Sequence, residues 1–213
     1  MDNTKIAIID YGMGNIYSIC NSVRALGAEA VVVSNPNELL SADSAILPGV
    51  GAYPDAMQRL RELGMDLAIH EFVGSGKPLL GICLGMQLLC KSSCENGVSE
   101  GLGIIPAIVR KFPRVEGYSI PQIQWNKVKS TSGQSTLLDG IPDDSYFYFL
   151  HSYYVEFLDS SVSGDLIVSD YCGMTYCSGF NIANVFATQF HPEKSGNLGS
   201  ILLRNFIKVG DSK

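Results

Sequence analysis

Strand-like and helix-like segments alternate over the first ninety residues of this 213-residue chain. Short apolar runs typical of buried strands lie at 4–12, 28–34, 41–49 and 77–82, and amphipathic stretches lie at 15–27, 52–76 and 84–93. Continuous runs of Val, Ile and Leu are typical of parallel strands that helices cover on both faces. The alternation therefore predicts a doubly wound α/β fold with a mostly parallel sheet and helices on both faces.

The pattern changes after residue 96. Short, turn-separated apolar segments follow at 101–113, 119–130, 145–157, 164–173 and 184–193, and an amphipathic stretch closes the chain at 195–210. Alternating segments of this length indicate additional antiparallel strands in the C-terminal half. With no internal repeat or linker-like stretch, we expect residues 1–213 to form one domain.

Neither composition nor charge indicates a nucleic-acid or membrane partner. The chain has 15 Lys and Arg residues against 21 Asp and Glu, a net charge of −6, so it lacks the basic surface that binds phosphate backbones. No segment approaches the roughly 20 apolar residues of a membrane helix. The N-terminus also lacks the basic region and cleavage site of a signal peptide. We therefore expect a cytoplasmic protein.

No metal or cofactor is expected from the sequence. The six cysteines, which we expect to be free thiols in a reducing compartment, are Cys20, Cys83, Cys90, Cys94, Cys172 and Cys177. The close pairs lack both the two-residue gap of zinc ligands and a nearby histidine. Gly12 and Gly14 follow the first strand as in a dinucleotide-binding turn, but Tyr17 occupies the third glycine position.

Cys83 lies between two glycines where the fourth apolar strand ends. Chemistry in open α/β sheets lies at the carboxyl ends of strands. A nucleophile on a sharp strand-to-helix turn needs small neighbours two residues away, as Gly81 and Gly85 are, because strand and helix backbones pass close together. A following helix would favour the reactive thiolate. The alternative is a buried structural cysteine in a glycine-flanked turn.

A cysteine nucleophile usually needs a base, and the chain has three histidines. His70 lies within the helical stretch 52–76 and is expected to be structural. His151 lies in an aromatic strand and is expected either to pack in the core or to serve as an alternative base. His191 ends the strand-like segment 184–193, and Glu193 follows two residues later. Its carboxylate could hold one ring nitrogen while the other takes the thiol proton, which predicts a Cys83–His191–Glu193 triad.

A second glycine-containing loop follows the third strand, at Gly49, Val50 and Gly51. Two glycines allow a peptide to turn its N–H toward a bound oxyanion, and the N–H of Leu84 would point at the same atom. The loop can also be read as an ordinary turn. Its position beside the Cys83 strand favours an oxyanion site.

Four segments together resemble the class I, or triad-type, glutamine amidotransferases. They are "PGVGAYPDAM", "GKPLLGICLGMQLL", "YFYFLHSYYV" and "ATQFHPEKSG". Within that class the chain is most similar to glutaminase subunits of imidazole glycerol phosphate synthases in histidine biosynthesis. The resemblance implies that Cys83 attacks the glutamine side-chain amide and that ammonia passes to a (β/α)-barrel cyclase subunit, forming a heterodimer that makes imidazole glycerol phosphate and AICAR.

The resemblance also implies residue roles. Gln87 and Glu95 match glutamine-contacting positions, and Ser152 and Tyr153 match the segment that holds the backbone end of the substrate. The Val50 peptide would act as a switch that responds to the partner. The positions implied at the partner interface are Asn15, Pro121, Gln122, Trp125, Asn126 and Lys194. Read without the resemblance, Trp125 could equally be a core aromatic residue.

The chain departs from the family pattern before Trp125. The family segment usually reads Pro-His-Met-Gly-Trp, whereas Gln122 and Gln124 replace the histidine and the glycine here. A different partner is therefore an alternative, and the related glutaminases that supply ammonia to enzymes amidating surface sugars are the second hypothesis. Outside this group, the alternatives are a stand-alone γ-glutamyl cysteine hydrolase and a flavodoxin-like binding module.

Overall fold

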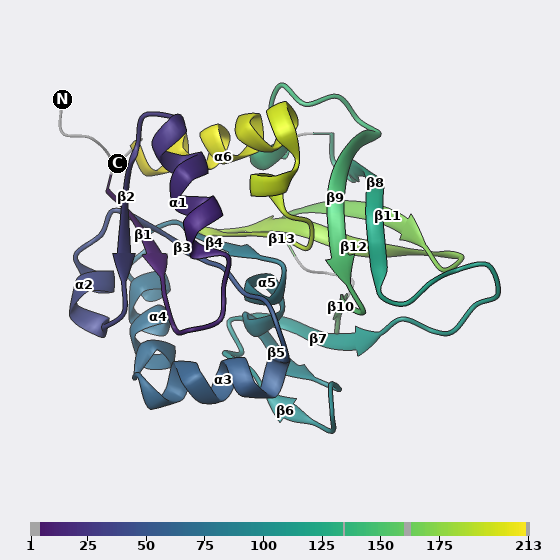
Figure 1. Ribbon diagram of the computed structural model, residues 1–213, viewed down its shortest axis with the longest axis horizontal. Coiled ribbons are helices and arrows are strands. Elements are labelled where there is room, and N and C mark those ends of the chain that lie inside the picture. The colour runs from purple at the N-terminus through teal and green to yellow at the C-terminus, as the bar shows by residue number, and fades with distance from the viewer. Residues whose placement is uncertain (1–4, 134, 160–162, 212–213) are drawn as a thin grey trace.

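Five parallel strands form the centre of the molecule in the order β2-β1-β3-β4-β13 (Figure 1). The computed structural model describes residues 5–133, 135–159 and 163–211. The parallel strands are β1 (Lys5–Ile9), β2 (Glu29–Val33), β3 (Ser44–Leu47), β4 (Leu79–Ile82) and β13 (Val185–Thr188). The last of these comes from the far end of the sequence and pairs in parallel with β4.

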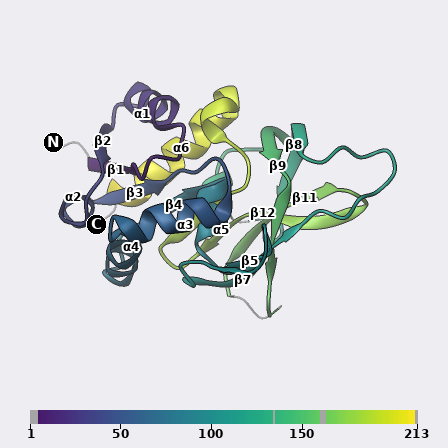
Figure 2. The same ribbon diagram turned by 60° about the horizontal axis from the view of Figure 1, so that its bottom comes forward.

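Helices cover both faces of these strands (Figures 1 and 2). One face carries α1 (Ile16–Ala25) and α6 (Gly196–Asp211). The other carries α2 (Pro36–Leu40), α3 (Tyr53–Glu62), α4 (Met65–Gly74) and α5 (Leu84–Leu88). Successive side chains of β1 enter the two cores in turn, because strand side chains alternate between faces. The predicted doubly wound α/β fold is confirmed.

Antiparallel strands extend the sheet beyond β13. They comprise β12 (Met174–Ile182), β10 (Tyr153–Phe157), β7 (Ile105–Lys111), β11 (Asp165–Tyr171), β8 (Gln122–Ser130) and β9 (Ser145–His151). Beyond β7 lie β5 (Cys90–Ser93), which runs parallel to it, and β6 (Ser99–Glu100). Two short 3₁₀ turns, η1 (Thr136–Leu138) and η2 (Pro192–Lys194), precede α6. The expected antiparallel addition in the C-terminal half is thus confirmed.

The bounds expected for three helices or strands were wrong. The helical stretch 52–76 is two helices, because Gly64 adopts φ +66 and ends the first. The helix expected at 84–93 ends at Leu88, since Cys90 instead pairs with Ile105 of β7. The segment 145–157 is two strands that break at Ser152. Helix α2 and strand β12 were not anticipated.

Surveyed over the described residues, the structure has no helix long and apolar enough to cross a membrane. Over the same residues there is no group of three or more His, Cys, Asp or Glu side chains that could hold a metal ion. All six cysteines are free thiols, and Cys94 is the exposed one among them.

Candidate active site

Cys83 sits on a strained turn between β4 and α5. Its backbone adopts φ 56 and ψ −111, a conformation that costs on the order of 1–3 kcal/mol for a residue other than glycine. A Cβ on Gly81 would lie 2.9 Å from the carbonyl oxygen of Gly85, and one on Gly85 would lie 1.9 Å from that of Leu47. Only glycine fits at either position, which is the close approach expected of a nucleophile turn.

The sheet topology brings two further loops to Cys83. Strand β4 lies between β3 and β13, with Leu47 opposite Gly81 and Thr188 opposite Ile82. The Cys83 N–H donates to the Thr188 carbonyl oxygen at 2.7 Å. Because all three strands are parallel, their carboxyl ends meet, and the expectation that the loop after β3 neighbours the Cys83 strand is confirmed.

A cavity of about 240 Å³ opens beside Cys83. Most of the residues expected from the sequence to meet glutamine or its oxyanion line it together. Its walls are Val50, Gly51, Cys83, Leu84, Gln87, Glu95, Pro121, Leu150, His151, Ser152, Tyr153 and His191. Segments from six different parts of the chain therefore converge on one small site, as substrate pockets commonly do.

His191 and Glu193 form a buried pair at this cavity. Nδ1 of His191 lies 2.8 Å from Oε1 of Glu193, and the two side chains are 2% and 1% exposed. The backbone is fixed as well, since the His191 N–H donates to the Tyr148 carbonyl oxygen at 2.9 Å. A carboxylate only accepts, so Nδ1 carries a proton and Nε2 remains for exchange with Cys83.

The charges around His191 favour its protonated form. Burial alone would lower its pKa, but the adjacent Cys83 thiolate and the bond to the Glu193 carboxylate outweigh burial and raise the pKa to about 10. A charged imidazole beside Cys83 in turn favours a thiolate over a thiol. The arrangement fits nucleophilic attack by sulfur followed by proton transfer from the ring.

The loop after β3 is packed tightly against the start of α5. A Cβ on Gly49 would lie 2.7 Å from Oη of Tyr11 and 2.8 Å from Cβ of Leu84. Gly51 adopts φ +102, which favours glycine. Val50 between them is 41% exposed and lines the cavity. The loop thus lies where an oxyanion formed at Cys83 could meet its peptide groups.

The residues expected to bind substrate line the same cavity. Glu95 accepts a hydrogen bond from the Tyr53 N–H at 2.8 Å, so its carboxylate is tied to the start of α3 while it faces the cavity. Ser152 and Tyr153 lie at the break between β9 and β10. Gln87 is buried and donates to the Tyr153 carbonyl oxygen at 3.2 Å.

Two residues near Cys83 were missed from the sequence as site residues. Gln189 is fully buried, and its Nε2 lies 3.6 Å from the Cys83 sulfur. The carbonyl oxygen of Leu150 lies 3.8 Å from that sulfur. The position of Gln189, two residues before His191 on the same strand end, is the one sequence signal that could have identified it. His70, expected to be structural, lies exposed on α4.

His151 is the second buried histidine of the cavity. Nδ1 lies 2.7 Å from the Tyr153 carbonyl oxygen, and Nε2 lies 3.4 Å from Oη of Tyr176. Burial lowers its pKa to about 4, with the charge on His191 acting in the same direction. It is therefore neutral at physiological pH. It packs among aromatic rings, which is the first of the two roles expected from the sequence.

The residues expected at a partner interface differ in their exposure. Trp125 is 51% exposed rather than packed in a core, and Pro121 is also exposed. Lys194 is exposed with its Nζ over the Tyr148 ring, 5.8 Å from the centroid. Asn15 and Asn126 are partly buried.

Gln122 does not reach this surface, so its assignment to a partner contact was wrong. It is 0% exposed and accepts a hydrogen bond from Oη of Tyr176 at 3.0 Å. Its place on β8 opposite His151 turns its side chain inward. The next residue, Ile123, points the other way and is 57% exposed.

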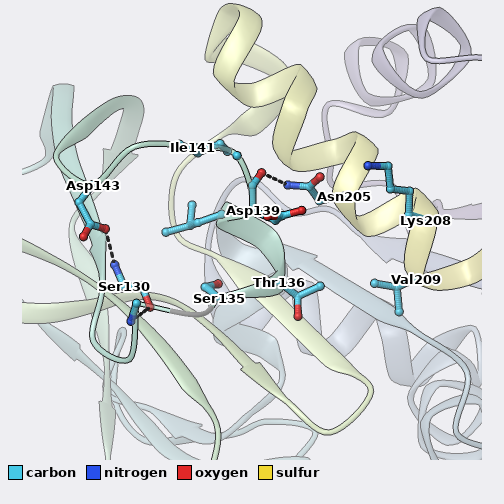
Figure 3. A pocket seen from close by; sticks show the side chains of 12 residues that line it. Ser130, Ser135, Thr136, Asp139, Ile141, Asp143, Asn205, Lys208 and Val209 are labelled. Atoms are coloured by element: carbon cyan, nitrogen blue, oxygen red, sulfur yellow. Dashed lines mark hydrogen bonds between the residues drawn. The ribbon is translucent and has the colours of Figure 1, made fainter.

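A larger cavity of about 670 Å³ lies elsewhere, between the η1 segment and α6 (Figure 3). Its walls include Ser130, Thr136, Asp143 and Asn205 but no cysteine or histidine. The Asn205 amide is already committed to two carbonyl oxygens, those of Leu137 at 3.1 Å and Asp139 at 2.8 Å. These contacts anchor η1 to α6, whereas the reactive groups gather at the smaller cavity.

Comparisons with known proteins identify the family of this chain. The family model described as glutamine amidotransferase class-I matches residues 7–209. Curated proteins named imidazole glycerol phosphate synthase subunit HisH are similar over nearly their whole length. One from Dehalococcoides mccartyi (strain CBDB1) is 46% identical over 98% of this chain and 100% of the relative. One from Bacillus cereus (strain B4264) is 47% identical over 96% of this chain and 94% of the relative.

Solved structures share the fold at lower identity. A glutamine amidotransferase from Thermotoga maritima superposes with a TM-score of 0.69 at 17% identity, covering 100% of this chain and 100% of that one. The structure of PurLQS from Thermotoga maritima gives a TM-score of 0.77 at 17% identity, with 97% and 99% covered. At these identities the likeness establishes the fold alone.

Proposed function

This chain belongs to the class-I glutamine amidotransferase family, and we propose that it is the glutaminase subunit of an imidazole glycerol phosphate synthase. The observation that carries the proposal is the buried Cys83 on its strained turn, which shares one cavity with a His191 held by Glu193 at 2.8 Å. The near-full-length likeness to curated proteins of that name supports the same enzyme.

The reaction proceeds through a thioester. The Cys83 thiolate attacks the amide carbon of glutamine, and the carbonyl electrons move onto oxygen. When the carbonyl re-forms, the carbon–nitrogen bond breaks, His191 gives its Nε2 proton to the departing nitrogen, and ammonia leaves. The now neutral His191 takes a proton from water, which attacks the thioester. Cleavage of the carbon–sulfur bond releases glutamate and restores the thiolate–imidazolium pair.

The cavity walls supply the remaining roles. Peptide groups of Gly49 to Gly51 and the Leu84 N–H would stabilise the oxyanion, a contribution worth about 10²–10³-fold per donor in other enzymes. Gln87 and Glu95, which line the same cavity, would contact the substrate. Ser152 and Tyr153 would hold its backbone end. The Val50 peptide would change orientation when the partner binds its own ligand.

Ammonia passes to a second subunit in this proposal. The curated relatives are named as synthase subunits, which supports a partner that uses the ammonia, here a (β/α)-barrel cyclase. Ammonium is not a nucleophile, so direct transfer away from bulk water has a chemical advantage. The exposed Trp125, with Pro121, Asn126, Lys194 and Asn15, would form the contact face. A cytoplasmic location stays the expectation.

The test is glutamine hydrolysis by the purified chain, alone and with a histidine-pathway cyclase subunit plus the nucleotide ligand of that subunit. We expect strong stimulation by the liganded partner and no hydrolysis by the Cys83→Ala variant. The circular dichroism spectrum and melting temperature of the variant should match those of the wild type, since one small buried side chain replaces another. Retained turnover in the folded variant would contradict the mechanism.

If the cyclase subunit does not stimulate hydrolysis, the proposed partner is wrong but the proposed chemistry at Cys83 is not. If Cys83 still reacts with a glutamine-like electrophile, the acceptor differs, and the substitution at the exposed Gln124 favours the sugar-amidating alternative. High activity without any partner would instead favour the stand-alone γ-glutamyl hydrolase.

A further inference from the structure

We infer that Gln189 is a positioning residue whose amide N–H holds the Cys83 sulfur in its thiolate form and links it to the substrate-contacting Gln87. The inference deepens the proposed function and rests on it for the role of Cys83. Gln189 is 0% exposed. Its Nε2 lies 3.6 Å from the Cys83 sulfur, and its Oε1 lies 2.9 Å from Nε2 of Gln87.

The orientation of the Gln189 amide is dictated by a chain of hydrogen bonds that starts at a backbone carbonyl. The carbonyl oxygen of Tyr153 can only accept, so the Gln87 group that meets it at 3.2 Å must be its NH₂. The same NH₂ meets Gln189, which must therefore present its oxygen there. The NH₂ of Gln189 then faces the sulfur, and no amide flip satisfies all three contacts.

The backbone around Gln189 leaves the amide little freedom. The Gln189 N–H donates to the Ser178 carbonyl oxygen of β12 at 2.8 Å. On the other side of the network, Nδ1 of His151 donates to the same Tyr153 carbonyl at 2.7 Å. Both ends of the hydrogen-bond chain are thus anchored in strands, which makes the donor at the sulfur preorganised rather than adaptable.

Several other groups bear on the charge of the sulfur. The protonated His191 favours the thiolate, whereas the Leu150 carbonyl oxygen at 3.8 Å can accept only from the thiol. The Tyr11 hydroxyl faces the sulfur and donates to the Pro48 carbonyl oxygen.

Two more titratable side chains line the same cavity as the sulfur. They are the neutral His151 on β9 and Glu95, on the loop after β5. Gln189 donates a side-chain hydrogen bond to the sulfur, and its contribution adds to that of His191, which also bonds to Cys83.

The variant Gln189→Met tests the donor, because it keeps the length of the side chain and removes the N–H. We would measure the rate of Cys83 alkylation by iodoacetamide as a function of pH, by mass spectrometry of the peptide that holds Cys83. The pH midpoint should rise by about one unit, with about tenfold slower alkylation on the acid side, since a hydrogen bond to a charged acceptor is worth at least that much. Alkylation of the exposed Cys94 in the same samples is the internal control.

A second variant and a matched control separate positioning from loss of packing. Gln189→Glu keeps the shape but places a carboxylate against the sulfur, so its midpoint should rise further than that of the Met variant. Asn205→Leu removes another buried amide, on α6, and should leave the Cys83 profile unchanged even if the protein melts earlier. Unchanged midpoints in both Gln189 variants would overturn the inference.

The readout does not depend on glutamine turnover. A shifted alkylation profile in a protein that never hydrolyses glutamine would sustain the role of Gln189 at the sulfur and refute the proposed function. If the wild-type enzyme hydrolyses glutamine but the Gln189 variants show no shift, the proposed function stands and the role of Gln189 is refuted.

Discussion

The cavity contains two buried histidines, of which His191 is charged and His151 is neutral. His191 and His151 are 2% and 6% exposed, and both line the cavity beside Cys83. At the end of β13, His191 meets the Glu193 carboxylate and the Cys83 sulfur, and its pKa rises to about 10. At the end of β9, His151 is surrounded by the rings of Phe112, Phe149 and Tyr176 with centroids 5.3, 5.6 and 5.7 Å away.

The difference shows that counter-charge, and not access to water, selects the acid–base residue in this site. Desolvation acts against a charged ring at both histidines, and it prevails at His151, where the pKa falls to about 4. Only His191 has a carboxylate to offset that cost. A neutral second histidine cannot give a proton to departing ammonia, so the cavity contains one proton donor of this kind and not two competing ones.

Removing His191 should have the largest effect. In His191→Ala, glutamine hydrolysis should fall by about 10²–10⁴-fold, the usual contribution of a positioned acid–base group. Steady-state kinetics with the partner present would measure the loss, and His70→Ala, which alters an exposed histidine on α4, is the matched control. Normal rates in His191→Ala would transfer the role to His151 and remove the distinction between the two regions.

Neutralising the carboxylate should make His191 more like His151. In Glu193→Gln the ring keeps a hydrogen-bond partner but loses the charge that offsets its burial, so its pKa should fall. The high-pH limb of kcat/KM should move to lower pH by about one to two units, the usual effect of one close opposite charge. Glu156→Gln, at an exposed ion pair with Arg110, should leave the profile in place. A profile of Glu193→Gln that matches the wild type would mean that Glu193 only orients the ring.

Local sequence patterns were enough to predict the Cys83 turn and the His191–Glu193 pair. The spacing of Gly81, Cys83 and Gly85 encodes a turn that only glycine permits, and the His191-Pro192-Glu193 run encodes its own side-chain pair. Both are short-range features. The parallel order of the strands follows from continuous apolar runs, which is why the two loops beside Cys83 could be anticipated.

The remaining features depend on contacts between distant segments. Gln189 meets Gln87 and Cys83 across 102 and 106 residues, so its place two residues before His191 does not by itself predict either contact. The inward turn of Gln122 is set by the register of β8 against β9, and a shift of one residue would have exposed it. Likewise Cys90 leaves the expected helix because β7 offers it a strand partner.

The smallest expected effect is on stability in mild acid, and it isolates His151. Because its folded pKa is depressed, His151 stabilises the fold fully above its unfolded pKa of about 6.5, and that stabilisation is lost as pH falls toward 4. Between pH 6.5 and 5.5 the free energy of unfolding should fall by about 1 kcal/mol, since His151 becomes protonated in the unfolded chain but stays neutral in the folded one. His151→Phe keeps a ring among the aromatic neighbours and removes this term.

Urea unfolding of wild type and His151→Phe at the two pH values measures that difference. Subtracting one protein from the other cancels titrating groups that do not interact with His151, and leaves the His151 contribution together with its coupling to His191. His191 acts with the opposite sign, because its raised pKa gives stability at low pH that is lost as pH rises toward 10. Parallel pH dependences in the two proteins would mean that His151 accepts a proton inside its aromatic surroundings. That result would disprove the assignment of one charged and one neutral histidine to this cavity.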